Sequence, residues 1–161
     1  MQQTMFDFLQ PSTGVSPTEP TSKPPEEADD MLAFFGDEYT DIYTRADALE
    51  DGELVDVSQM AREAGMPLPT AITRAVFARL TPSDEEAALG QDFSGRLWDL
   101  LNILMYSARR NPNTDTIPFY FLMQEMSEKQ RMRQIQVHVI AKLHGGDEGE
   151  PVVTIGYPSD F

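Results

Sequence analysis

Four charged residues beside apolar helical faces are the first candidates for chemistry. Arg62 and Glu63 are neighbours in one predicted helix, and Arg96 and Asp99 lie about one turn apart in another. A guanidinium beside a carboxylate could hold a phosphate group or position a proton donor and acceptor. Ion pairs on a helix surface use the same residue types at the same spacing. We therefore expect helix ion pairs and no catalytic residues, with an enzyme of unrecognised type as an alternative.

A second group of charged residues is acidic and falls in the first third of the chain. The sequence has 27 acidic and 12 basic residues, which gives a net charge of −15. The predicted acidic surface consists of Asp37, Glu38, Asp41, Asp47, Glu50, Asp51 and Glu53. Carboxylates held at phosphate-like spacing could mimic nucleic acid and inhibit a host defence protein. The favoured interpretation is a solvated face that keeps the protein soluble.

A short apolar motif at the N-terminus has the spacing of a peptide ligand. Gln2, Met5 and Phe6 follow the pattern with which bacterial replication and repair proteins bind the sliding clamp. With a longer spacing, Gln2, Met5, Phe8 and Leu9 resemble the peptide that binds the eukaryotic and archaeal clamp. The amide would hydrogen-bond to a pocket rim while the apolar side chains fill the pocket. The alternative is an apolar tail that docks on its own domain or has no role.

The composition excludes several kinds of site and partner. Without cysteine there is no disulfide framework, zinc ribbon or cysteine nucleophile, and two histidines cannot build a three-histidine metal site. We expect no metal and no cofactor. The acidic balance argues against direct nucleic-acid binding. No apolar run approaches the roughly 20 residues that span a bilayer, and no secretion signal follows Met1. A cytoplasmic protein without membrane contact is expected.

The order of these segments predicts a tail followed by one domain. Residues 10–30 contain five prolines and no aromatic residue, so they cannot bury enough surface to offset their ordering entropy. We interpret residues 1–30 as a disordered tail that carries the short motif. Residues 31–161 are expected to form a single α+β domain.

The predicted domain has several short helices and one long helix. Thr44 and Ser58 are candidate N-caps, a third helix is expected from about Thr70 to Arg79, and the longest runs from Ser94 to about Arg110. Alternation of apolar and polar residues over 135–143 predicts a half-exposed strand, with further strands at 119–123 and 152–155. We expect the long central helix to pack on a three-stranded antiparallel sheet near the C-terminus.

Four ordered blocks resemble a known family. They are residues 42–57, 61–65, 95–99 and 149–155. Together they are similar to an uncharacterised bacterial family of unknown function that occurs on plasmids, phages and integrated elements, over roughly residues 40–157. Their possible motif residues are Arg45, Arg62, Glu63, Arg96 and Asp99. The resemblance implies a mobile-element context and assigns no catalytic residues.

These observations together predict a non-catalytic interaction or accessory protein of a mobile genetic element. Its expected partner is a protein, either a replication clamp or a host defence or DNA-processing protein. The sequence gives no oligomeric state.

Overall fold

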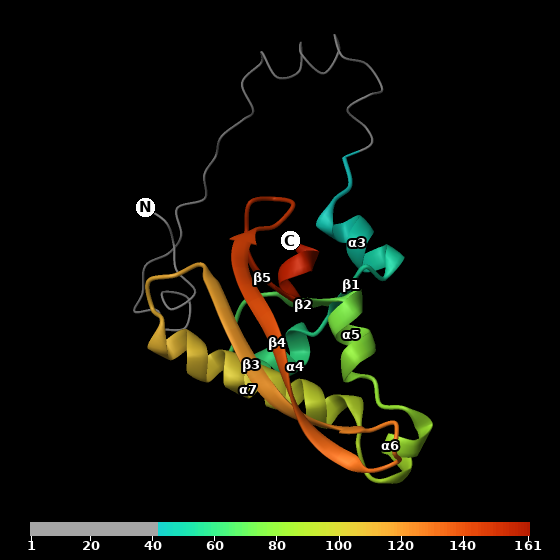
Figure 1. The fold of residues 1–161 in the computed structure, drawn as a ribbon. Helices are drawn as coiled ribbons and strands as arrows, with labels where there is room; N and C mark the ends of the chain where they lie inside the picture. Colours follow the sequence, from blue (N-terminus) through green and yellow to red (C-terminus); the bar gives the residue numbers. More distant parts are fainter. Residues whose placement is uncertain (1–41) are drawn as a thin grey trace, which may run out of the picture.

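The computed structural model describes residues 42–161, which form helices around a five-stranded sheet (Figure 1). The helices are α3 (Arg45–Asp51), α4 (Ser58–Glu63), α5 (Arg74–Leu80), α6 (Asp84–Ala88), α7 (Phe93–Arg110) and the short 3₁₀ helix η2 (Pro158–Asp160). The strands are β1 (Leu54–Asp56), β2 (Thr70–Thr73), β3 (Thr116–Met126), β4 (Met132–Gly145) and β5 (Pro151–Gly156). The predicted tail of residues 1–30 lies outside the described residues.

The α+β class is confirmed, but the predicted three-stranded antiparallel sheet is wrong. Within residues 42–161, the observed sheet has five strands in the order β1-β2-β5-β4-β3. β2 and β5 run parallel, while the other neighbouring strands are antiparallel. The hairpin of β3 and β4, together with β5, corresponds to the predicted part. β1 and β2 extend the sheet beyond β5 and make it mixed.

The predicted third helix begins too early. Residues 70–73 form β2, and the helix α5 starts only at Arg74. Every residue of β2 is buried, because the strand lies in the sheet between β1 and β5. Thr73 ends the strand and its hydroxyl accepts a hydrogen bond from the Val76 N–H, which makes it the N-cap of α5. Thr73 therefore marks the position at which β2 ends and α5 begins.

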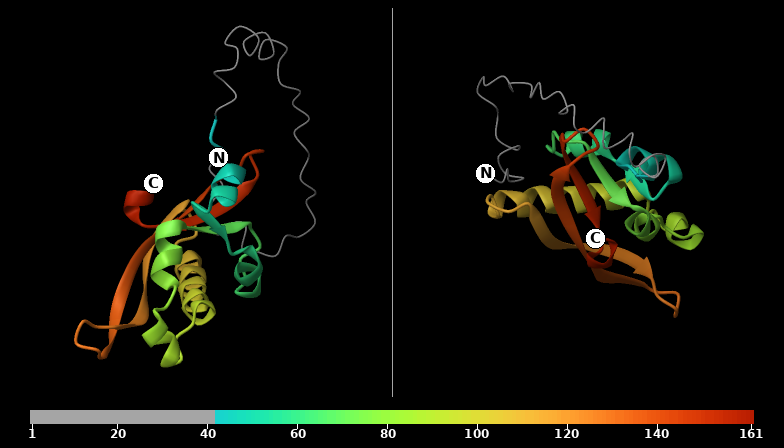
Figure 2. Two further views of the ribbon diagram at one scale, coloured as in Figure 1. Left: turned by 90° about the vertical axis from the view of Figure 1, so that its right-hand side faces the viewer. Right: turned by 90° about the horizontal axis from the view of Figure 1, so that it is seen from above.

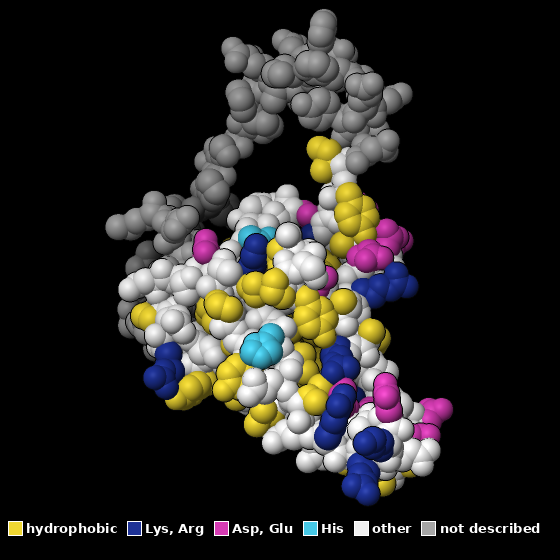
Figure 3. Space-filling view, in the orientation of Figure 1, with side chains coloured by type: hydrophobic (Ala, Val, Ile, Leu, Met, Phe, Trp, Pro, Cys, Tyr) yellow, Lys and Arg dark blue, Asp and Glu magenta, His cyan; other side chains and the backbone are white. Residues whose placement is uncertain are grey.

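The core lies between α7 and one face of the sheet (Figure 2). Leu97, Leu100, Leu101 and Leu104 on α7 are all buried. On β3 the odd-numbered residues from Ile117 to Glu125 are buried and the even-numbered residues 118–124 are exposed. The alternation predicted for β4 is confirmed over residues 135–143 in the same sense. The even-numbered side chains 118–124 of β3 are therefore exposed on the face opposite α7, whereas β2 and β5 are buried on both faces, and Figure 3 shows apolar side chains over the β3–β4 part of this face.

The predicted helix starts differ in how they are capped. Thr44 is the N-cap of α3 and forms a capping box with Asp47, as its sequence position predicts. Ser58 opens α4 but does not cap it. Its hydroxyl instead donates to Asp56 and accepts from the Thr70 N–H, which ties the end of β1 to β2. Ser58 thus stabilises the sheet edge.

Candidate functional site

Arg45 joins the first helix to the last strand. Its Nη1 donates to the Thr154 hydroxyl at 2.6 Å, and its Nη2 donates to the Val153 carbonyl at 3.2 Å. Burial lowers the pKa of the Arg45 guanidinium, and the carboxylates of Asp147, Asp56 and Glu150 oppose that effect. Arg45 is therefore held by β5 and does not extend into solvent.

The loop between β4 and β5 completes this junction. The Asp147 carboxylate accepts hydrogen bonds from the backbone N–H groups of Arg45 and Ala46, at 2.7 and 2.9 Å. His144 Nε2 lies 2.7 Å from the Thr154 hydroxyl. A carboxylate suits the positive end of a helix, so Asp147 stabilises α3 across more than a hundred residues of chain. Nothing in the local sequence around Asp147 signals this contact.

Arg96 forms a second junction, in the interior. Its side chain is 5% exposed, and its Nη2 donates to the Glu86 carboxylate at 2.9 Å and to the Gln124 carbonyl at 2.7 Å. Its Nη1 donates to the Leu80 carbonyl, while Nε has no partner among the described residues. The expected pairing of Arg96 with Asp99 along the helix is wrong, because the guanidinium points towards α6 and the end of β3.

Glu86 is ionised in this junction. Burial alone would raise the pKa of its carboxyl group, but hydrogen bonds from the Met126 N–H, the Arg96 guanidinium and the Ser83 N–H lower it below the ordinary value. The Met126 N–H lies 2.7 Å from Glu86 Oε1. Arg96 and Glu86 together therefore bind the outward-facing backbone at the end of β3.

The other residues proposed for acid–base chemistry do not join Arg96. Arg62 and Glu63 are exposed on α4, and Asp99 is exposed on α7. Within residues 42–161, no ion pair links Arg62, Glu63, Arg96 and Asp99 with one another. Because Arg96 is buried and the other three side chains are exposed, the four do not form one site within residues 42–161.

Four residues of the predicted acidic surface lie within the described residues. The carboxylates of Asp47 and Glu53 bind other groups of the domain, whereas those of Glu50 and Asp51 are exposed. Asp47 accepts from the N–H and the hydroxyl of Thr44, which lowers the pKa of its carboxyl group. Glu53 pairs with Arg74 at 3.0 Å. Glu50 and Asp51 are exposed on α3. Asp37, Glu38 and Asp41 lie outside the described residues, as does the motif of Gln2, Met5, Phe6, Phe8 and Leu9.

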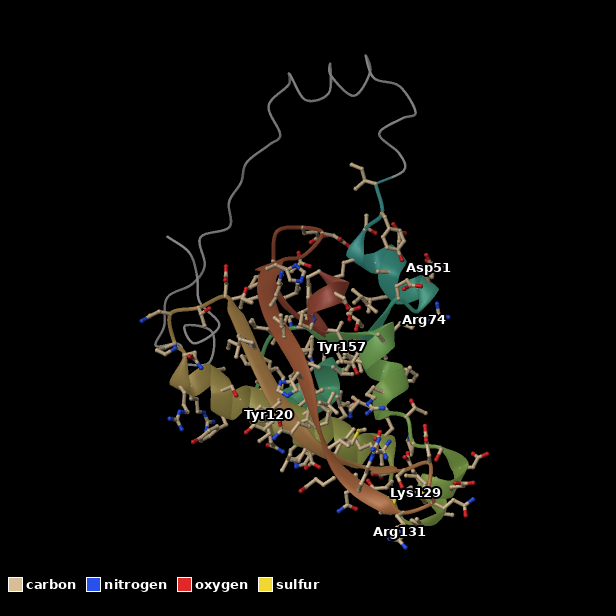
Figure 4. The ribbon with its side chains drawn as sticks, in the orientation of Figure 1. Asp51, Arg74, Tyr120, Lys129, Arg131 and Tyr157 are labelled. Carbon is tan, nitrogen blue, oxygen red and sulfur yellow. The ribbon has the colours of Figure 1, made fainter. Side chains whose placement is uncertain are left out.

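A small group of basic residues lies at the β3–β4 hairpin, away from this acidic region. Figure 4 shows Lys129 and Arg131 at the tip of the β3–β4 hairpin, away from Asp51 and Arg74. Next to this tip, the largely buried Glu125 carboxylate pairs with Arg133 at 2.6 Å and with Arg79 at 2.8 Å. Through its ion pair with Arg79 on α5, Glu125 therefore attaches the hairpin tip to the rest of the domain. Its negative charge partly neutralises the neighbouring arginines.

An apolar groove lies where α7 runs beside β3. Its volume is about 480 Å³, and Ile103, Tyr106, Tyr120 and Leu122 contribute to its walls. The side chains of Tyr106, Tyr120 and Leu122 are 57%, 50% and 47% exposed. Phe119 and Phe121 are buried while Tyr120 is exposed, so this aromatic run has one face in the core. Exposed aromatic side chains beside a sheet edge are typical of protein-binding surfaces.

The described residues hold no candidate metal centre and no helix suited to a bilayer. No group of three or more His, Asp or Glu side chains within residues 42–161 is arranged to hold a metal ion. No helix in that part of the chain is long and apolar enough to cross a membrane.

These features define an α+β domain with a mixed sheet, two arginine junctions and an apolar groove. The chain belongs to a family of unknown function, DUF6573, whose model matches residues 31–161. The match confirms the family resemblance found from the four blocks and extends it at both ends. No curated protein and no solved structure matches the chain.

Proposed function

We propose that the protein is a non-catalytic accessory protein of a mobile genetic element. The family domain forms its body, and Gln2, Met5, Phe6, Phe8 and Leu9 form a peptide ligand for a replication clamp. The observation that carries this proposal is the position of the motif. The family match begins at residue 31, so the motif precedes the domain and is separated from it by the proline-rich residues 10–30.

The described domain supports this division of roles. Two of the polar residues in the family-like blocks, Arg45 and Arg96, form structural junctions with Thr154 and Glu86. A ligand on a long linker would reach its partner without changing the domain, and the linker would raise its effective concentration near that partner.

A peptide of residues 1–12 tests the clamp proposal directly. We expect it to bind a bacterial sliding clamp in a fluorescence anisotropy titration, and replacement of both Met5→Ala and Phe6→Ala to abolish binding. The matched control changes Gln3→Ala and Thr4→Ala, the two variable positions of the motif, and should bind as the natural peptide does. Absence of binding by the natural peptide at high micromolar concentration would overturn the proposal.

A second candidate function is inhibition of a defence protein by nucleic-acid mimicry. The observation in its favour is that Glu50 and Asp51 are exposed on α3, which is anchored rigidly through Arg45. Because Asp47 and Glu53 are engaged within the domain, the described carboxylates form a smaller array than the sequence predicts. This function requires binding to a nuclease or DNA-binding defence complex that weakens steeply with salt. Binding unaffected by salt would exclude it.

A further inference from the structure

β3 is an edge strand whose outward backbone groups can be assigned residue by residue. Among residues 42–161, it pairs with β4 on one side only. The Leu143 N–H donates to the Asp115 carbonyl, and the Ser127 N–H donates to the Arg131 carbonyl. Residues with odd numbers therefore direct their N–H and C=O groups towards β4. In an antiparallel pair the alternate residues face away, so the even-numbered residues 116–126 form the outer edge.

Both ends of this edge are closed within the chain. At the start, the Thr114 hydroxyl accepts from the Thr116 N–H and donates to the Thr116 carbonyl. At the far end, Arg96 donates to the Gln124 carbonyl and Glu86 accepts from the Met126 N–H. Pro118 has no N–H to offer.

The tract that remains open is short and has a definite pattern. It begins with the Pro118 carbonyl, continues with both backbone groups of Tyr120 and of Leu122, and ends with the Gln124 N–H. Within residues 42–161, no side chain hydrogen-bonds to any of these groups. An exposed edge of this kind is a template for another strand.

We propose that the occupant of this edge is β3 of a second copy of the chain. The open tract is complementary to itself when two copies run antiparallel with the Phe121 residues facing each other on the two-fold axis. Tyr120 then lies opposite Leu122 of the second copy, and each donates to the other's carbonyl. The Gln124 N–H meets the Pro118 carbonyl. The N–H that Pro118 lacks would have faced the Gln124 carbonyl, which Arg96 already occupies.

Neighbouring registers lack this match. With the axis at Tyr120, the Leu122 carbonyl would face the ring of Pro118 and lose its donor. With the axis at Leu122, the Tyr120 N–H would face the Gln124 carbonyl that Arg96 holds. The pattern of open groups therefore selects one register and favours a two-fold partner over an unrelated strand.

The side chains beside the tract fit the same arrangement. Tyr120 and Leu122 are each about half exposed, and the pairing places an aromatic ring against an aliphatic side chain on the open face of each sheet. The groove containing Ile103 and Tyr106 borders the same edge, on the α7 side. Because a two-fold axis perpendicular to the sheet keeps both α7 helices on one face, these exposed residues would approach their counterparts.

Charge substitutions at the paired positions test the arrangement in the full-length chain. We expect the unmodified protein to have the mass of a dimer in sedimentation equilibrium. Combining Tyr120→Lys with Leu122→Lys places lysines opposite one another and should give a monomer with an unchanged circular dichroism spectrum. Combining Tyr120→Lys with Leu122→Glu places opposite charges together and should restore the dimer. A monomeric natural chain, or a Lys/Lys variant that remains dimeric, would overturn the proposal.

Cysteine pairs test the register, because the natural chain has no cysteine. The double variant Tyr120→Cys with Leu122→Cys should form disulfide-linked dimers on mild oxidation, because residues facing each other across paired strands lie about 5.5 Å apart between Cα atoms. Either single variant should give little cross-linking in this register. Efficient cross-linking by a single variant, or none by the double variant, would overturn it.

Discussion

The two edges of the sheet are protected by different means. β1 is three residues long, and α3 and α5 lie next to it, so that little backbone is left to pair. β3 is 11 residues long and would be a long open edge without Thr114, Pro118, Arg96 and Glu86. Short edge strands and edge prolines both limit unwanted pairing. The comparison teaches that β3 is closed at its ends by particular side chains and left open only in its middle.

The largest expected effect comes from removing Arg96. Arg96→Ala would leave Glu86 buried without its ionic partner and would free the Gln124 carbonyl at the closed end of β3. Breaking a buried ion pair in this way costs about 3–5 kcal/mol of unfolding free energy. Urea denaturation would measure it. The control Asp99→Ala, at an exposed position on the same helix, should change stability by less than about 0.5 kcal/mol. Equal stability of the two variants would contradict the role given to Arg96.

Glu86→Gln tests the closed far end of β3 through the pH dependence of stability. The folded-state pKa of Glu86 is lowered, so its charge stabilises the protein above the unfolded pKa of about 4.3. That stability is lost as the pH falls through the lower, folded pKa. At neutral pH the variant should be less stable by about 1.5–3 kcal/mol, the range for hydrogen bonds to charged groups.

The measurement is the unfolding free energy as a function of pH, with and without the substitution. The difference between the natural protein and Glu86→Gln should shrink as the solution becomes more acidic than the unfolded pKa. A difference that is constant with pH would show that the Glu86 charge contributes nothing.

Arg45→Ala tests α3, the helix that lies next to the short edge strand β1. It removes the hydrogen bonds from α3 to Thr154 and Val153, at an expected cost of about 1–2 kcal/mol. Hydrogen exchange should become faster in α3, which precedes β1, and remain unchanged in β3. Arg74→Ala is the control, since its ion pair with Glu53 is exposed and should contribute about 1 kcal/mol or less. Equal acceleration in α3 and β3 would mean that the two edges are not protected separately.

The smallest expected effect is at the N-cap of α3. Thr44→Ala removes the hydroxyl that accepts from the Asp47 N–H and should cost about 1 kcal/mol. Thr44→Ser keeps the hydroxyl and should be close to the natural protein in thermal denaturation. Equal stability of the Thr44→Ala and Thr44→Ser variants would show that the hydroxyl does not stabilise α3, the helix next to β1.

Local patterns in the sequence predicted the parts of the fold that depend on local structure. The alternation in β4 and the capping position of Thr44 are examples. The sequence does not predict β2, because its four residues are all buried and show no alternation, and because its neighbour β5 comes from a distant segment. The sequence of residues 70–79 therefore predicts one continuous helix, although the strand β2 ends at Thr73.

In the candidate site, too, contacts between distant segments are hard to predict from local sequence patterns. The pairing of Arg96 with Glu86 joins α7 to α6, and only the spacing of Arg96 with the buried Leu100 and Leu104 signals that its side chain faces inward. The contact of Asp147 with α3 has no local signal, because the two segments meet only in the folded sheet. The open tract of β3 could not be found without knowing which residues face β4.

The parallel pairing of β2 with β5 has a consequence for biosynthesis. Arg45 and Thr154 are 109 residues apart, and β5 leaves the ribosome after β1 to β4. The buried side chains of β2 therefore lack their neighbour β5 until β3 and β4 have been translated, whereas the β3–β4 hairpin can close earlier. Late contacts of this kind slow folding and expose apolar segments in the meantime. The nascent chain is thus most dependent on chaperones in the interval between the emergence of β2 and the emergence of β5.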